Sequence, residues 1–281
     1  MKFTVPVDGV LDASHALSVL AIHSLPNQER LDREASSVVR VLRIDDQLHE
    51  LKILLGTHEA TVHTQAPESL HPRLAKIIST WLGLADSNEL SYQQLATISA
   101  LQPALDNFPN LRLISYPDLF EALATTVLGQ QISTSAARTL ATRFVEALGE
   151  LHACGLRAFP DAHATAQLTA EELQQVIRCP LSRAETLLRV ATWFIHTGGR
   201  LAENHDEFLS SLLALKGVGP WTRDYVALRG LRQKSIFLDT DLVVKRAMRQ
   251  LRIPDIECLQ LPEGARSLAT VLLWAFEANK N

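Results

Sequence analysis

Apolar and polar residues alternate over the first part of the chain, as they do in β-strands that bury one face. The segments with this pattern are residues 2–7, 39–44, 48–55 and 57–64. Apolar residues at helical spacing occupy residues 13–25 and 69–82. We therefore predict a small α/β domain, a sheet with helices, over residues 1–112.

From Pro117 onward the apolar positions follow the helical repeat instead. Five of them stand at i, i+3, i+4, i+7 and i+8, the pattern of a buried helix face: Phe120, Leu123, Ala124, Val127 and Leu128. Further amphipathic segments are residues 134–149, 170–178, 182–197 and 266–278. These patterns predict a mainly α fold, with a helical domain over residues 113–281 beside the smaller N-terminal α/β domain.

Residues 205–230 carry the pattern of two helices joined by a glycine-rich turn. Gly217 and Gly219 permit positive φ and the close approach of another backbone, and Pro220 suits the first position of a helix. The N–H groups of such a turn lie at a helix N-terminus and can bind an anion, for which a phosphate is the obvious candidate. An ordinary αα-hairpin is the alternative interpretation.

Basic residues gather in and after this hairpin. Residues 216–252 contain nine Lys and Arg against three Asp, in a chain whose formal net charge is −4. Residues 1–112 contain nine basic and thirteen acidic residues. A local basic patch on an acidic protein is suited to follow a phosphate backbone, although a solvated face is the commoner origin of a charge cluster.

One carboxylate stands out after the hairpin. Asp241 follows the apolar pair Phe237-Leu238 and precedes the apolar run Leu242-Val243-Val244, so it lies where a loop meets a buried helix. From this spacing alone, a carboxylate is more often an N-cap than a catalytic group. Both interpretations stay open at this point.

The composition, with 47% hydrophobic and 21% charged residues in 281, is that of an ordinary globular protein. Membrane spans need about 20 apolar residues, and no run approaches that length. Because the N-terminus has acids where a signal peptide is apolar, we expect a cytoplasmic location. The scattered Cys154, Cys179 and Cys258 indicate reduced thiols and are too few for a four-thiolate iron–sulfur cluster. The ten histidines show no metal-binding spacing, and His58 and His63 are expected at the surface.

The stretch LKGVGPWT, followed by YVALRG and FLDTD, resembles the signature of the helix-hairpin-helix (HhH-GPD) DNA glycosylases. Within that superfamily the chain is most similar to the bacterial 3-methyladenine DNA glycosylase II type. The resemblance extends to residues 128–133 and 180–185 and covers about residues 115–281 well. It implies a base excision repair enzyme that flips a damaged base out of double-stranded DNA.

The resemblance assigns the catalytic role to Asp241, with Asp239 as the second choice. A carboxylate there stabilises the oxocarbenium-like transition state of N-glycosidic bond hydrolysis. Relatives that also cut the strand carry a lysine where this chain has Trp221, which implies a monofunctional enzyme. Trp221 and Tyr225 lie one helical turn apart and are expected to stack on the extruded base.

The resemblance also implies the DNA-contacting residues and a cation site. The DNA-contacting residues are Gln130, Gln131, Lys216, Gly217, Gly219 and Thr222, with Gln131 at the position of the wedge that fills the gap left by the flipped nucleotide. A monovalent cation, Na⁺ or K⁺, is expected on the backbone carbonyls of Leu213, Leu215 and Gly217. We expect no required cofactor and no iron–sulfur cluster.

Two departures from the family pattern concern the base pocket. Ala265 replaces an expected tryptophan and Leu242 replaces a frequent aromatic residue, so one wall is expected to be less aromatic. These departures leave the preferred lesion open. The resemblance implies a monofunctional glycosylase for alkylated bases, expected to act as a monomer. The alternatives are a non-catalytic HhH DNA-binding protein and a glycosylase for another base, such as uracil or 8-oxoguanine.

Overall fold

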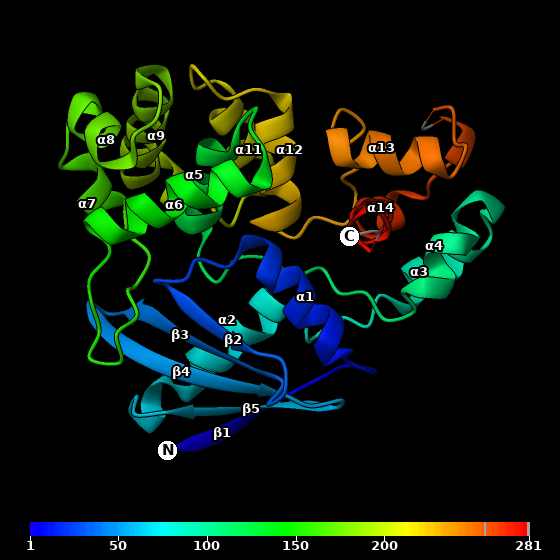
Figure 1. Cartoon of the computed structure of the whole chain (residues 1–281), viewed down its shortest axis with the longest axis horizontal. Helices are drawn as coiled ribbons and strands as arrows, with labels where there is room; N and C mark the ends of the chain where they lie inside the picture. The colour runs from blue at the N-terminus through cyan, green and yellow to red at the C-terminus, as the bar shows by residue number, and fades with distance from the viewer. Residues whose placement is uncertain (256, 280–281) are drawn as a thin grey trace.

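The computed structural model describes residues 1–255 and 257–279, and the side chain of Cys258 lies outside the described part. Its N-terminal sheet is antiparallel, with strand order β1-β5-β4-β3-β2 (Figure 1). The strands are β1 (Lys2–Pro6), β2 (Glu29–Asp32), β3 (Ser37–Ile44), β4 (Gln47–Leu55) and β5 (Glu59–Thr64). The four predicted strands are confirmed, whereas β2 was missed because its four residues include a single apolar one, Leu31.

The β3–β4 hairpin shows how local sequence sets the register of the sheet. Asp45 and Asp46 have φ of 49° and 60°, so they form a tight two-residue turn of the kind that matches strand twist. The turn pairs Val38 with Ile53 and Arg40 with Leu51. The face that carries Val38 and Ile53 is therefore largely apolar, with Arg40 as a buried exception.

Two helices cover that apolar face, α1 (Ala13–His23) and α2 (His71–Leu82). Leu17 of α1 and Ile78 and Trp81 of α2 are buried in one cluster with Val38 and Ile53 of the sheet. Both helices occupy the segments expected from their apolar spacing. Burial of this face stabilises the domain at about 25 cal/mol per Å² of apolar surface.

A second body, formed by helices, lies above the sheet in Figure 1. Its helices are α5 (Leu119–Gly129), α6 (Thr134–Leu148), α7 (Ala162–Ala166), α8 (Ala170–Ile177), α9 (Leu181–Trp193), α10 (Gly199–Leu201), α11 (His205–Leu213) and α12 (Pro220–Arg229). They enclose a core that contains Phe144, Leu187, Phe208 and Val226. The predicted helical pattern and the hairpin of α11 and α12 are confirmed.

A third group of helices lies beside the others and combines two helices that follow the sheet in sequence with two helices from the C-terminal part of the chain (Figure 1). It contains α3 (Glu89–Ala96), α4 (Gln102–Asn107), α13 (Leu242–Gln250) and α14 (Arg266–Ala278). The Ser91 hydroxyl of α3 donates to the Gly264 carbonyl at 3.0 Å, and Leu101 and Leu272 share one apolar cluster. The division of the chain at residue 112 stays a prediction, while core packing places residues 89–107 with the C-terminal helices.

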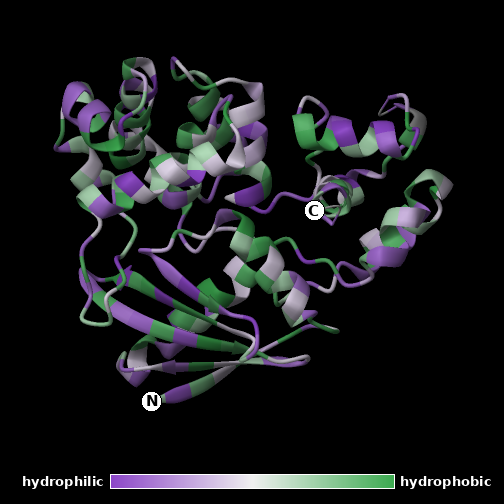
Figure 2. Cartoon of the chain, viewed as in Figure 1, coloured by the Kyte–Doolittle hydropathy of each residue, from purple (hydrophilic) through white to green (hydrophobic). Residues whose placement is uncertain are grey.

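The hydropathy colouring agrees with this arrangement, since the helices carry hydrophobic and hydrophilic residues in alternating bands (Figure 2). Within the described residues, no helix combines the length and apolar character that crossing a membrane requires.

A buried ion cluster connects the sheet to α5. The Arg40 guanidinium of β3 donates to the Glu29 carboxylate at 2.9 Å and also contacts Glu121 of α5. It lies over the ring of Trp81, 5.1 Å from the centroid. Burial raises the pKa of Glu121 to about 7 against the opposing charge of Arg40, and Glu29 raises it further. One arginine is thus shared by two carboxylates.

Candidate active site beside the hairpin

Asp241 is the N-cap of α13 and is held by four N–H donors. Its Oδ1 accepts from the backbone N–H groups of Val243 (2.9 Å) and Val244 (3.1 Å) and from Trp274 Nε1 (3.2 Å). Its Oδ2 accepts from Trp221 Nε1 at 3.2 Å. The predicted N-cap is confirmed, and the side chain is half-buried. The carboxylate is therefore fixed in orientation while part of it stays open to solvent.

Three aromatic rings border this carboxylate. The centroids of Trp221 and Tyr225 are 5.1 Å apart with their planes at 33°, as expected for residues one helical turn apart. Tyr225 and Trp274 are 5.7 Å apart with planes at 43°. Trp221 and Trp274 also donate to Asp241, so two of the three rings touch the group that they surround.

Trp274 was not predicted as a site residue, because its spacing placed it among the apolar residues of α14. A half-buried tryptophan needs a partner for its indole N–H, and that requirement was the available signal. Ala265, the position expected to carry the missing tryptophan, is fully buried. Trp274 adds an aromatic ring beside Asp241 and Tyr225, and Leu242 is 69% exposed, so the prediction of one less aromatic wall stays a prediction. Asp239 is exposed in the preceding loop.

The turn after α5 meets the hairpin directly. Gln130 Nε2 donates to the Gly217 carbonyl at 2.9 Å and to the Thr222 hydroxyl at 3.0 Å. Thr222 is only 4% exposed, so its hydroxyl serves this link rather than the surface, where it was expected to contact DNA. Gln131 is exposed with φ of 56°, a left-handed conformation that is uncommon for a residue with a side chain.

Helix α9 holds both turns from behind. Arg183 Nη2 donates to the Gln130 carbonyl at 2.5 Å, and Arg189 Nη1 donates to the Lys216 carbonyl at 2.7 Å. Gly217 has φ of 92°, and a Cβ there would lie 2.2 Å from Thr186 Oγ1. Only glycine fits this contact, which explains the first glycine of the turn in packing terms.

The remaining hairpin residues lie at the surface or border it. Lys216 is exposed, and Gly219 caps α12 with open space where a Cβ would stand. Of the carbonyls expected to bind a cation, that of Leu215 accepts from Val218 N at 3.0 Å and that of Gly217 accepts from Gln130. Leu213 ends α11. The cation site stays a prediction.

The basic patch is smaller than the sequence predicted. Arg229 is buried, with its guanidinium 5.2 Å from the centroid of the Tyr116 ring. Arg232 donates to the Thr80 carbonyl at 2.6 Å, and Lys234 and Arg246 pair with acidic side chains. Four residues remain exposed among those for which no ion pair is assigned: Lys216, Lys245, Arg249 and Arg252. The number of Lys and Arg residues in the sequence does not distinguish these exposed residues from those that are buried or paired in the fold.

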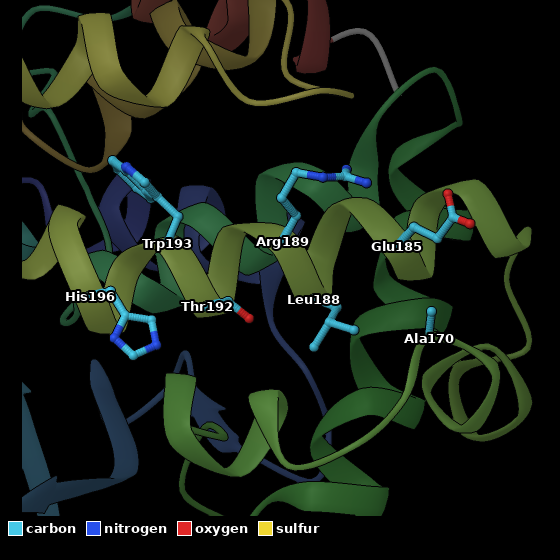
Figure 3. A pocket seen from close by; sticks show the side chains of 7 residues that line it. All are labelled: Ala170, Glu185, Leu188, Arg189, Thr192, Trp193 and His196. Atoms are coloured by element: carbon cyan, nitrogen blue, oxygen red, sulfur yellow. The ribbon is translucent and has the colours of Figure 1, made fainter.

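A groove of about 530 Å³ lies along α9 and is lined mostly by residues of that helix. Figure 3 shows Leu188, Thr192 and His196 on one side of the helix, with Arg189 and Trp193 on the other. Its lining includes neither Asp241 nor any of the three aromatic residues around it. The groove is thus separate from the candidate active site.

Residues 124–260 match the family model described as HhH-GPD superfamily base excision DNA repair protein. The chain is 31% identical over 188 residues to a DNA-3-methyladenine glycosylase of Bacillus subtilis, which covers 64% of this chain and 61% of that protein. It is 27% identical over 233 residues to DNA-3-methyladenine glycosylase 2 of Escherichia coli, covering 77% of each. The match therefore spans less than two thirds of the Bacillus relative.

The fold matches a solved structure over its whole length. The 3-methyladenine DNA-glycosylase from Archaeoglobus fulgidus superposes with a TM-score of 0.85 at 18% identity, covering 98% of both chains. At this identity the likeness concerns the fold. It includes the N-terminal sheet, which lies outside the residues matched by the family model.

Proposed function

Because the chain belongs to the HhH-GPD superfamily of base excision DNA repair proteins, we propose that it is a monofunctional DNA glycosylase for alkylated bases. The observation that carries this proposal is the Asp241 carboxylate, fixed by four N–H donors beside three aromatic rings. Its partner would be double-stranded DNA that contains a damaged base. The similarity to two 3-methyladenine glycosylases supports the choice of substrate class.

The reaction would begin with a base turned out of the duplex and placed against Trp221 and Tyr225. An N-alkylated purine is cationic, and aromatic faces attract a cation. As the N-glycosidic bond lengthens, positive charge develops on the sugar, and a fixed carboxylate nearby lowers the energy of that transition state. Asp241 would fill this role and orient the water that attacks the anomeric carbon.

The rest of the machinery would hold the DNA. Gln131, exposed on its left-handed turn, would occupy the gap left by the flipped nucleotide. Lys216 and the N–H groups around Gly217 and Gly219 would bind a phosphate at the start of α12. A Na⁺ or K⁺ ion on hairpin carbonyls is part of the proposal, but no redox cofactor enters the hydrolysis. Trp221 offers no amine, so the product would be an intact strand with an abasic site.

Two alternatives remain to be tested beside this one. A glycosylase for uracil or 8-oxoguanine would use the same carboxylate with a different base in the pocket. A non-catalytic DNA-binding protein would use the hairpin alone. The placement of Asp241 against two indole N–H groups favours catalysis, because binding to phosphates does not need an oriented carboxylate.

The deciding experiment compares base release by the wild-type protein and by Asp241→Asn. Asparagine keeps an N-cap oxygen for α13, so the variant removes the charge and leaves the helix start intact. We expect DNA binding to persist and the excision rate from methylated duplex DNA to fall about 100-fold or more. Abasic sites are revealed by alkali cleavage, and single-turnover kinetics give the rate.

Asp239→Asn is the matched control, since Asp239 is exposed two residues earlier. It should excise at the wild-type rate, and loss of activity there instead would move the catalytic assignment. Release from uracil- or 8-oxoguanine-containing DNA, but not from methylated DNA, would change the substrate class. Binding without release from any of these substrates would favour the non-catalytic protein.

A further inference from the structure

The loop between α6 and α7 leaves the helical body and lies against the sheet (Figure 1). It forms a small hairpin with an isolated bridge between Leu151 and Arg157. His152 N donates to the Leu156 carbonyl at 2.8 Å, and Gly155 N donates to the His152 carbonyl at 2.9 Å. Gly155 has φ of 84°, which a turn this tight requires.

Polar contacts fix the loop in place. Arg157 N donates to the Asn27 carbonyl at 2.8 Å, and Arg30 Nη1 donates to the Cys154 carbonyl at 3.1 Å. Leu156 packs in a small apolar cluster with Val41 of β3. These contacts hold the side chains on the inner surface of the loop against the outer face of the sheet.

Glu50 of β4 lies on that outer face. It pairs in register with Val41, the residue that Leu156 covers. One carboxylate oxygen of Glu50, one ring nitrogen of His152 and the Cys154 thiol all lie within 4.8 Å of one another. All three residues are half-buried, so they are partly shielded and still accessible to an ion.

We infer that Glu50, His152 and Cys154 bind a divalent transition-metal ion of the zinc class. A thiolate, an imidazole nitrogen and a carboxylate are the ligand types that zinc takes in proteins, and three of them leave a fourth position for water. The soft sulfur selects against Mg²⁺ and Ca²⁺, which prefer oxygen ligands. Such a site is not visible in the sequence, because Glu50 is distant in the chain from the His152–Cys154 turn.

Binding changes the protonation of the turn. The thiol of Cys154 gives its proton to solvent when the metal–sulfur bond forms. Cys154 N donates to His152 Nδ1 at 3.2 Å, so this ring nitrogen already directs a lone pair into the turn beside the thiol. A metal on Nδ1 would replace that long hydrogen bond.

The bound ion would join the α6–α7 loop, and through it the helical body, to the sheet. This role is independent of base excision, because none of the three ligands belongs to the site around Asp241. A ligand that binds only the folded chain raises the melting temperature. At a zinc concentration about 100 times the Kd, we expect a rise of about 5 °C or more for a chain of this size.

The test uses the reduced, metal-stripped full chain titrated with Co²⁺, whose thiolate complexes absorb by sulfur-to-metal charge transfer. We expect one ion per chain and a charge-transfer band that is lost in Cys154→Ser. Glu50→Gln should keep the band and weaken binding about tenfold or more, because a direct ligand contributes at least as much as the outer-shell groups whose loss costs about 10- to 100-fold. Cys179→Ala and Cys258→Ser are the controls and should bind as the wild type does.

Circular dichroism confirms that each variant is folded before titration. The inference is overturned if folded wild type gives no charge-transfer band, if the band survives in Cys154→Ser, or if it disappears in Cys179→Ala or Cys258→Ser. Wild-type affinity in Glu50→Gln would remove Glu50 from the ligand set and with it the proposed link to the sheet. Excision assays play no part, so failure of the proposed function would leave this test valid.

Discussion

Two carboxylates in this protein are both held by hydrogen bonds and yet lie in opposite surroundings. Asp241 is half-buried, and the donors assigned to it are neutral N–H groups from two backbone amides and two indoles. Glu121 is buried and contacts the Arg40 guanidinium. The first arrangement orients a negative charge and leaves it available to a developing cation, whereas the second neutralises the charge. Under the proposed function, orientation without neutralisation separates Asp241 from the structural Glu121.

Disturbing the ion cluster of Arg40, Glu29 and Glu121 should cost more unfolding free energy than disturbing the hydrogen bonds of Asp241. In Arg40→Ala two buried carboxylates lose their shared cation, and breaking a buried pair in this way costs about 3–5 kcal/mol of unfolding free energy. Arg73→Ala is the matched control, because its pair with Asp45 is exposed on both sides and should change stability by less than about 1 kcal/mol. Urea unfolding at pH 8, above the pKa of about 7 of Glu121, measures both. Similar losses in the two variants would contradict the contrast between buried and exposed pairs.

The same cluster predicts how stability depends on pH. Folded Glu121 keeps its proton up to about pH 7, whereas the unfolded residue loses it near 4.5, so between these values the folded chain binds more protons. The contribution of Glu121 is therefore full below pH 4.5 and is lost as the pH rises through 7, a change on the order of 1–3 kcal/mol.

Urea unfolding at pH 5, 6 and 7 would show the effect as a difference between wild type and Glu121→Gln. The variant cannot titrate at this position, so its stability should fall less over this range. A parallel pH dependence in both proteins would mean that Glu121 is ionised throughout and fully compensated by Arg40. In that case Glu121 and Asp241 would both be ionised and would differ in burial alone.

At Asp241, an indole N–H donor can be removed while an aromatic ring is kept in its place. Trp274→Phe deletes the 3.2 Å bond to Oδ1 and keeps an aromatic side chain beside Tyr225. A hydrogen bond to a charged group contributes about 1.5–3 kcal/mol, so we expect excision about 10- to 100-fold slower in single-turnover assays.

Trp193→Phe provides the control, because its indole donates at 2.8 Å to Ser211 in the helical body rather than to Asp241. It should leave the excision rate unchanged. Equal rates in wild type and Trp274→Phe would show that the two amide donors of α13 orient the carboxylate without help from that indole.

The sequence singled out Asp241 but not its surroundings. Asp241 could be found because its motif and its N-cap position are local in the chain. Trp274, the Gln130–Gly217 link and the Arg40 cluster join segments that are far apart in sequence, and local periodicity contains no information about such pairs. Residues 89–107 illustrate the same limit, since they follow the sheet in sequence and pack against α14.

A last contrast concerns cations, and its expected effect is the smallest. Lys216 is exposed at the hairpin, whereas Arg229, counted in the same basic segment, is buried over Tyr116. If Lys216 neutralises one phosphate, Lys216→Ala should lower the slope of log K against log salt concentration by about 0.9. Fluorescence anisotropy with a labelled duplex measures this slope. The control is Lys76→Ala, on the exposed side of α2, which should leave the slope unchanged. Equal slopes for the wild type and both variants would place the phosphate-binding cations elsewhere. The exposed Lys245, Arg249 and Arg252 would then be the next residues to test.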